Sequence, residues 1–228
     1  MSEFAAGPAG RIERVRALMA ERGYDAIVVR DEANLRWLTG VKGVFDYTFE
    51  FPHAAFITAD QCLFHTDSRY LNSFEENTPA GSPWVYDMDE GTIPGWVAGK
   101  IVANKCRVCA VEDDMQINFY QGIQRGLEDR SVACMLPLMH DDIRKMRAIK
   151  DAEEIELMRH AQSITDAAFQ HMLGFIKPGM TEKQVRNELE NFMFANGADS
   201  LAFGSIVASG PNTANPHAVP SDRVIEKG

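Results

Sequence analysis

The sequence predicts an α/β protein in which a domain built on a mixed sheet is followed by a second, helix-rich unit. Short apolar runs of strand length alternate with helical patterns over residues 1–146, an order typical of a sheet covered by helices. Two longer helical patterns dominate the rest of the chain. We therefore expect two domains, at residues 1–146 and 147–228.

The elements of the first domain follow from local patterns. Apolar residues recur at helical spacing over residues 11–22, and Gly23 ends that helix. Asp31 is a typical N-cap for the next helix, which ends at Gly40. A hairpin is indicated around residues 59–61. The expected strands are 25–29, 54–58, 62–66, 84–86, 107–111 and 131–135, and the other expected helices are 68–76, 93–103, 118–126 and 141–146.

The second domain opens with a long helix, expected over residues 151–175 and apolar on one face from Ile155 to Met172. Thr181 caps a second helix that runs to about residue 196. His160 and His171 are about three turns apart on the first helix, so they cannot bind one ion and are interpreted as surface or packing residues. The carboxylates Glu153, Glu154, Glu188 and Glu190 are interpreted as parts of solvated, charged helix faces.

One stretch near the end of the sequence combines a strand pattern with a histidine-bearing loop. The apolar run 203–208 predicts a buried strand, which breaks at the turn signal 209–212. His217 follows on a loop that Pro216 and Pro220 stiffen. A histidine held in this way can serve as a proton carrier. From the local pattern alone, a surface loop with an incidental histidine is equally consistent.

Several motifs follow one another in a specific order. They are D-x-x-N-L-x-W-L-T-G from Asp31, T-D-S-R-Y from Thr66, R-x-x-K-x-x-x-E-I from Arg147, P-G-x-T-E from Pro178, F-x-x-I-V-x-S-G-x-N from Phe203 and P-H-A-x-P-S-D-R from Pro216. The set resembles the creatinase and proline-specific metallopeptidase family, from about residue 10 onward. The resemblance implies a creatinase-type N-terminal α/β domain followed by the first part of a pita-bread α+β catalytic domain.

The resemblance also implies an activity and a site. Family members hydrolyse the bond next to a proline, or in creatinase a C–N bond of a small guanidino compound. His217 is then expected to contact the scissile carbonyl or to shuttle a proton, Phe203 to line the same cavity, and Asn34 to reach a substrate in a homodimer. The implied substrate is a proline-containing peptide. A creatinase-type hydrolase and a non-catalytic binding or assembly protein remain open alternatives.

The family's metal ligands are two aspartates, a histidine and two glutamates that follow the P-H-A segment. These residues hold two divalent ions, which are expected to be manganese, cobalt or zinc. No such set follows His217 before Gly228. We therefore expect the two ions in the full-length protein, none bound by these 228 residues, and no hydrolase activity from them alone.

The composition argues against some classes of binding partner. A formal net charge of −10 argues against nucleic acid or an anionic membrane surface. No apolar run approaches the ~18 residues of a membrane span, so a cytoplasmic location is expected. The Cys106–Cys109 pair has a C-x-x-C spacing but precedes a strand pattern, in which positions i and i+3 point to opposite faces. Zinc binding by this pair is not expected.

Overall fold

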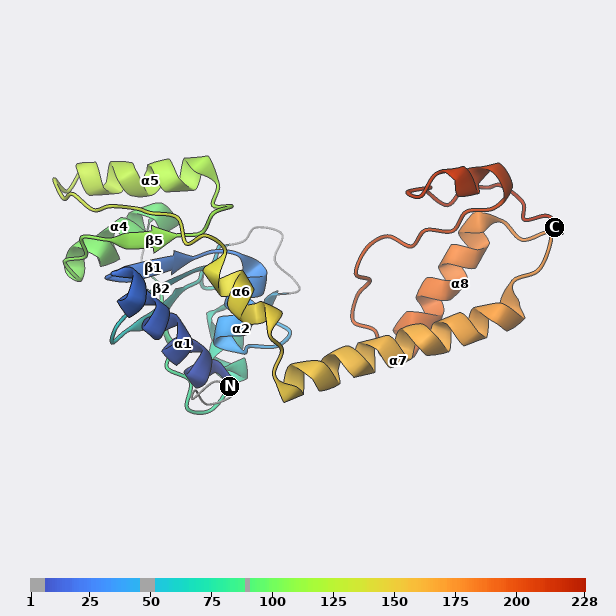
Figure 1. The fold of residues 1–228 in the computed structure, drawn as a ribbon, viewed down its shortest axis with the longest axis horizontal. Helices are drawn as coiled ribbons and strands as arrows, with labels where there is room; N and C mark the ends of the chain where they lie inside the picture. Colours follow the sequence, from blue (N-terminus) through green and yellow to red (C-terminus); the bar gives the residue numbers. More distant parts are fainter. Residues whose placement is uncertain (1–6, 46–51, 89–90) are drawn as a thin grey trace. The chain divides into compact units, whose positions relative to one another are not determined.

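The computed structural model describes residues 7–45, 52–88 and 91–228. The chain divides into two compact units, Met1–Ile149 and Lys150–Gly228, and each is described by itself (Figure 1). The sequence places the start of the second unit at Arg147. In the structure the Arg147 side chain bonds to Asn34 of the first unit, so the division after Ile149 keeps this contact within one unit.

The first unit contains a five-stranded mixed sheet, as the sequence predicts. Its spatial order is β4-β3-β2-β1-β5. The β1–β2 and β2–β3 pairs are antiparallel, whereas β1–β5 and β3–β4 are parallel. The predicted hairpin joins β2 to β3, with Thr58 and Cys62 on either side of its loop. The strands are β1 (Ala26–Val29), β2 (Ala54–Thr58), β3 (Cys62–His65), β4 (Val85–Asp87) and β5 (Cys109–Val111).

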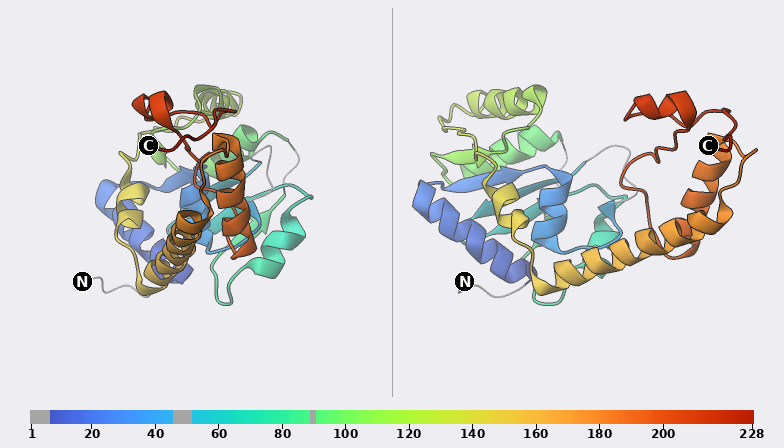
Figure 2. Two further views of the ribbon diagram at one scale, coloured as in Figure 1. Left: turned by 90° about the vertical axis from the view of Figure 1, so that its right-hand side faces the viewer. Right: turned by 45° about the vertical axis from the view of Figure 1, so that its right-hand side comes forward.

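Helices cover both faces of this sheet. One face packs against α1 (Gly7–Arg22), α2 (Glu32–Thr39), α3 (Leu71–Asn77) and α6 (Asp142–Ala148). The other packs against α4 (Ile93–Ala103) and α5 (Ile117–Glu128). Figures 1 and 2 show α4 and α5, in green, on the side of the sheet opposite to α1, in blue. The first unit is therefore a three-layer α/β/α arrangement.

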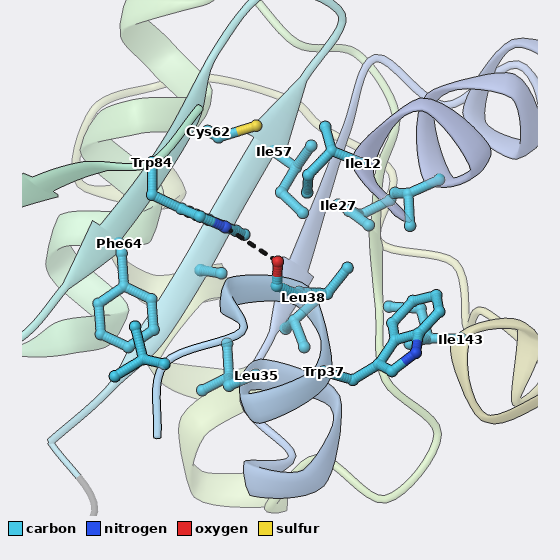
Figure 3. Packing of buried hydrophobic residues seen from close by; sticks show 14 of the residues in the cluster. Ile12, Ile27, Leu35, Trp37, Leu38, Ile57, Cys62, Phe64, Trp84 and Ile143 are labelled. Atoms are coloured by element: carbon cyan, nitrogen blue, oxygen red, sulfur yellow. Dashed lines mark hydrogen bonds between the residues drawn. The ribbon is translucent and has the colours of Figure 1, made fainter. Parts of the chain in front are cut away.

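Alternation along β1, which lies between β2 and β5, divides the core into two clusters. Ile27 and Val29 face the cluster formed with α1 and α2, while Ala26 and Val28 face the cluster formed with α4 and α5. Figure 3 shows part of the first cluster, in which Trp84 also donates a hydrogen bond from Nε1 to the Leu38 carbonyl oxygen at 3.1 Å. The indole is thereby buried with its polar atom satisfied.

The predicted caps of α2 are confirmed. Asp31 Oδ1 accepts a hydrogen bond from the Asn34 backbone N–H at 2.7 Å. At the other end Gly40 has φ 67°, the left-handed conformation that closes a helix at little cost for glycine. Its position is also crowded, because a Cβ there would lie 2.6 Å from a Pro8 ring carbon. Both conformation and space therefore require glycine.

The second unit contains α7 (Ala152–Phe175), α8 (Glu182–Ala195) and the short 3₁₀ helix η2 (Gly210–Ala214). The expected apolar face of α7 is buried only in its C-terminal half, at Ile164, Ala168 and Met172. Ile155 and Met158, expected on the same face, are 38% and 58% exposed. Packing between α7 and α8 therefore involves only part of the predicted stripe. Across the described residues, no helix combines the length and the apolar character needed to cross a membrane.

The two histidines of α7 have different surroundings. His171 Nε2 lies 2.6 Å from Glu188 Oε1 on α8, and its ring stacks on Phe192 with the centroids 4.4 Å apart. His171 is thus a packing residue between the helices, and Glu188 is its partner rather than a purely solvated side chain. His160 is exposed.

Two of the expected strands are wrong. Residues 131–135 form no strand; Met135 and Leu138 make only isolated parallel bridges to β5 or its flank. Pro137 lies between the two bridges and lacks the N–H that a continuous ladder needs. Residues 203–208 also form no strand, and Phe203 is 73% exposed. A strand requires a neighbour for its backbone hydrogen bonds, and the described chain gives residues 203–208 none.

The C-x-x-C pair differs from its expected geometry. β5 begins at Cys109 rather than at Arg107, so Cys106 precedes the strand and the alternation rule does not apply to it. Both side chains belong to the same buried cluster. Burial raises the pKa of the Cys106 thiol to about 11 and also raises the pKa of the Cys109 thiol well above its ordinary value. Since metal ligands and nucleophiles are thiolates, these thiols behave as apolar core groups.

Candidate functional site

The loop that carries His217 is attached to the start of α8. We name residues 209–221 the His217 loop. Thr181 caps α8 in a capping box: its Oγ1 accepts from the Gln184 N–H at 3.2 Å, and Gln184 Oε1 accepts from the Thr181 N–H at 2.8 Å. The chain immediately after the His217 loop runs beside this cap, with an antiparallel bridge between Thr181 and Val224.

Glu182, the first residue of α8, is completely buried. Its carboxylate accepts hydrogen bonds from the backbone N–H and hydroxyl of Ser209, at 2.7 and 2.9 Å. It also accepts from the backbone N–H and hydroxyl of Ser221, at 3.1 and 2.7 Å. Asn212 Nδ2 lies 3.0 and 3.1 Å from its two oxygens. One carboxylate thus binds both ends of the His217 loop.

These donors change the acidity of Glu182. Hydrogen bonds from Ser221, followed by those from Ser209, lower the pKa of the Glu182 carboxyl to about 2, although burial acts in the opposite direction. Donors stabilise the ionised form of a carboxylate, and the start of a helix favours negative charge as well. Glu182 is therefore a carboxylate at neutral pH.

His217 lies on the wall of an open pocket of about 640 Å³. Its backbone N–H donates to Asn215 Oδ1 at 3.0 Å, and its side chain is exposed. The lining residues come from α8 and from two loop segments: Arg186, Glu190, 203–206 and 217–220. Phe203 and His217 therefore lie on the walls of one pocket. The pocket combines a largely apolar lining with one imidazole, a lining typical of small-molecule sites.

Asn34 belongs to the first unit and is buried there. Its Nδ2 donates to Glu112 Oε1 at 2.7 Å, and its Oδ1 accepts from Arg147 Nη1 at 2.7 Å. Arg147 also lies 3.5 Å from Asp31 Oδ1. Both ends of the Asn34 amide are thus bonded within this unit. Its predicted role as a substrate contact stays a prediction.

Glu112 is a second buried carboxylate, next to Asn34. Its Oε2 accepts from the backbone N–H groups of Arg30 and Asp31, at 2.5 and 2.7 Å. Burial raises the pKa of Glu112 to about 6, against the opposing effect of its hydrogen bonds from Asn34 and the backbone. The nearby charge of Asp31 also raises it. Sequence reasoning assigned no role to Glu112.

The residues present do not fit a two-metal centre. Within residues 7–45, 52–88 and 91–228, no group of three or more histidine, cysteine, aspartate or glutamate side chains is placed to hold an ion. The pocket at His217 offers one histidine and one carboxylate, Glu190. Metal sites in proteins ordinarily use three or more protein ligands.

The sequence also gives Glu182 no predicted role, although the residue is part of the P-G-x-T-E motif. A carboxylate directly after an N-cap threonine is a common helix start, so the local pattern gave no reason to select it. The available signal was the spacing of hydrogen-bonding residues in the loop. Ser209, Asn212 and Ser221 lie next to prolines or a glycine in the loop, where half-buried polar side chains need hydrogen-bond partners.

Comparison with known proteins identifies two family models along the chain. The creatinase/prolidase N-terminal domain matches residues 11–149, and metallopeptidase family M24 matches residues 156–228. An uncharacterized peptidase, YqhT, from Bacillus subtilis is 32% identical over 221 residues. The match covers 96% of this chain and 58% of that relative.

Solved structures of proline-specific peptidases also match this chain over most of its length. An Xaa-Pro dipeptidase from Bacillus anthracis superposes with a TM-score of 0.81 at 32% identity, covering 96% of this chain and 57% of that one. An X-Pro aminopeptidase from Thermotoga maritima superposes with a TM-score of 0.77 at 28% identity, covering 95% and 58%. The chain thus spans less than two thirds of the length of these proteins. The arrangement is a creatinase-type α/β domain followed by the first part of a pita-bread catalytic domain.

Proposed function

Because the chain belongs to the creatinase and prolidase family of metallopeptidases, we propose that it forms part of a peptidase that hydrolyses peptide bonds next to proline. Proteins with the same fold over this length include an Xaa-Pro dipeptidase and an X-Pro aminopeptidase. The observation that carries the proposal is the pocket that Phe203 and His217 share. It lies in the segment that matches the metallopeptidase model.

His217 is the proposed catalytic residue of this chain. An exposed imidazole on a pocket wall can donate a hydrogen bond to the carbonyl oxygen of the scissile bond or pass a proton to the leaving nitrogen. Phe203 supplies apolar surface against which a prolyl ring packs. In this proposal the substrate is a proline-containing peptide, and the protein acts as a cytoplasmic homodimer.

The metal requirement is a second part of the proposal. Two divalent ions, which are manganese, cobalt or zinc, are expected to be held by residues of the longer protein outside these 228. Such a pair supplies an activated water and a Lewis acid when bound. The 228-residue chain alone is then inactive and free of stoichiometric metal. Elemental analysis of the purified chain that finds one or more of these ions per chain contradicts this part.

The test uses the protein encoded by the complete reading frame, assayed with Xaa-Pro dipeptides, longer Xaa-Pro peptides and creatine. His217→Ala is expected to lower kcat/KM for the Xaa-Pro substrate by about 10²- to 10⁴-fold, the usual contribution of a positioned acid or base. The matched control is His140→Asn, because His140 is exposed and has φ 54°, which asparagine tolerates. Wild-type activity in His217→Ala, or hydrolysis of creatine alone, contradicts the proposal.

A further inference from the structure

The His217 loop is fastened at both of its ends to a single side chain. Oε1 of Glu182 accepts from the Ser209 N–H and hydroxyl, whereas Oε2 accepts from the Ser221 N–H and hydroxyl. The amide of Asn212, within η2, reaches both oxygens. The two carboxylate oxygens therefore divide the loop ends between them, and no water-exposed surface of Glu182 remains.

The backbone around Glu182 supports the same arrangement. Its own N–H donates to the Arg223 carbonyl at 3.1 Å, and the Lys183 N–H donates to the Ser221 carbonyl at 3.1 Å. The Gly179 N–H donates to the Ile225 carbonyl at 2.9 Å, and the Ile225 N–H donates to the Met180 carbonyl at 2.8 Å. Backbone hydrogen bonds thus hold the chain that follows the loop along the start of α8, and the Glu182 carboxylate holds the two ends of the loop.

Little freedom remains between the two fastened ends. Pro211, Pro216 and Pro220 each fix φ within the loop. The side chains of Ala218 and Pro220 are buried on either side of the exposed Val219. Gly210 has φ 49°, and a Cβ there would lie 2.6 Å from an Arg223 guanidinium nitrogen. The backbone that carries His217 is therefore restricted relative to α8 as long as the ends stay fastened.

We propose that Glu182 is the positioning residue for His217: its carboxylate holds Ser209 and Ser221 and thereby sets where the imidazole stands in the pocket. The Glu182 carboxylate is bonded to Ser209, Asn212 and Ser221 rather than to His217, so it acts through the loop. The catalytic consequence rests on the proposed function of His217. The effect on the position of the imidazole does not depend on that function.

The arrangement requires a carboxylate rather than any polar side chain of this size. Each Glu182 oxygen accepts from one backbone N–H, Ser209 on one side and Ser221 on the other. In Glu182→Gln one of these oxygens becomes an NH₂ group, which is a donor. Whichever way the amide turns, that NH₂ faces one of the two backbone N–H groups, so one end of the loop loses the hydrogen bond from its backbone N–H. A buried donor left without a partner is unfavourable.

Two measurements on Glu182→Gln test the proposal. In the 228-residue chain with ¹⁵N-labelled histidine, the imidazole signals of His217 should shift and broaden. In the protein from the complete reading frame, kcat for an Xaa-Pro peptide should fall about 10- to 10²-fold, as for a misplaced catalytic group, while KM stays within about twofold. The matched control is Glu188→Gln on the same helix, which neutralises the partner of His171 and leaves the loop contacts intact.

The outcomes separate the two proposals. Unchanged His217 signals in Glu182→Gln, or equal effects of Glu182→Gln and Glu188→Gln, overturn the positioning role. If His217→Ala keeps full activity, the proposed function fails, and the imidazole signals still decide the role of Glu182. Should Glu182→Gln fail to fold, Ser221→Ala replaces it, because this change removes one hydroxyl donor and keeps the carboxylate. A smaller shift of the His217 signals then supports the proposal, and no shift overturns it.

Discussion

Among the described residues, each of the two units buries one glutamate, and the surroundings of these two residues differ. In the first unit burial raises the pKa of Glu112 to about 6, whereas in the second unit the donors around Glu182 lower its pKa to about 2. Glu182 accepts from two hydroxyl groups in addition to backbone and amide donors, whereas the described donors at Glu112 are two backbone N–H groups and the Asn34 amide. The charge of a buried carboxyl therefore depends on the balance between burial, which raises its pKa, and the donors that stabilise the carboxylate.

The donors are also distributed differently. Both backbone N–H groups at Glu112, those of Arg30 and Asp31, point to the same oxygen. At Glu182 the two backbone donors point to different oxygens. A glutamine can therefore keep both backbone bonds at position 112 but only one at position 182. The first unit also has a hydrophobic core on both faces of its sheet, which the second unit lacks among its described residues.

The largest effect on stability is expected in that core. Phe74 is completely buried and lies 4.6 Å from Phe64 and 5.1 Å from Phe45 between ring centroids. Phe74→Ala should lower the free energy of unfolding of the first unit by about 3–5 kcal/mol. Urea unfolding followed by tryptophan fluorescence measures it, because all three tryptophans lie in this unit.

The control for this experiment is Leu173→Ala on α7, where the side chain is 64% exposed. It should change stability by no more than about 0.5 kcal/mol. A loss below about 1 kcal/mol for Phe74→Ala contradicts the view that the aromatic cluster stabilises the first unit.

The second effect concerns pH. Because the folded-state pKa of Glu112, about 6, is above its ordinary value of 4.5, its protonated form is favoured by folding. This contribution is complete below about pH 4.5 and is lost as pH rises through about 6, a decline of about 2 kcal/mol. The urea midpoints of wild type and Glu112→Gln, compared between about pH 4 and about pH 7, measure it. If the difference in urea midpoint between wild type and Glu112→Gln is the same at both pH values, the raised pKa of Glu112 is contradicted.

The smallest effect is local and lies in the second unit. Ser221→Ala removes one hydroxyl donor from Glu182 while the backbone bond of residue 221 can remain. Amide hydrogen exchange at residue 221 should accelerate about 5- to 30-fold, the equivalent of losing one hydrogen bond. Ser205→Ala is the control, since Ser205 lines the pocket without contacting Glu182. Equal exchange at residue 221 in wild type and Ser221→Ala is incompatible with a stabilising hydroxyl.

The sequence predicts the first unit well because its elements are specified locally. Apolar periodicity and caps such as Asp31 and Gly40 define most strands and helices within a few residues. The segments that local patterns misassign depend on other parts of the chain. Residues 203–208 have the composition of a strand without a neighbouring strand, and Pro137 interrupts a ladder that the preceding residues would otherwise continue.

The candidate site is only partly predictable for the same reason. The family resemblance predicts His217 and Phe203 as site residues, and both line the same pocket. Glu182 is 27 residues from Ser209 and 39 from Ser221 in sequence, and no periodicity connects them. Asn34 is recognisable from its motif, but its burial between Glu112 and Arg147 depends on residues 78 and 113 positions away.

The central claim is that Glu182 holds both ends of the His217 loop through separate oxygens. Amide hydrogen exchange in Glu182→Gln and Glu112→Gln tests it most directly, measured residue by residue in the 228-residue chain. We predict that the Ser209 or Ser221 amide loses about tenfold or more of its protection in Glu182→Gln, while the Arg30 and Asp31 amides keep theirs in Glu112→Gln. Unchanged protection of both serine amides in Glu182→Gln would contradict the claim.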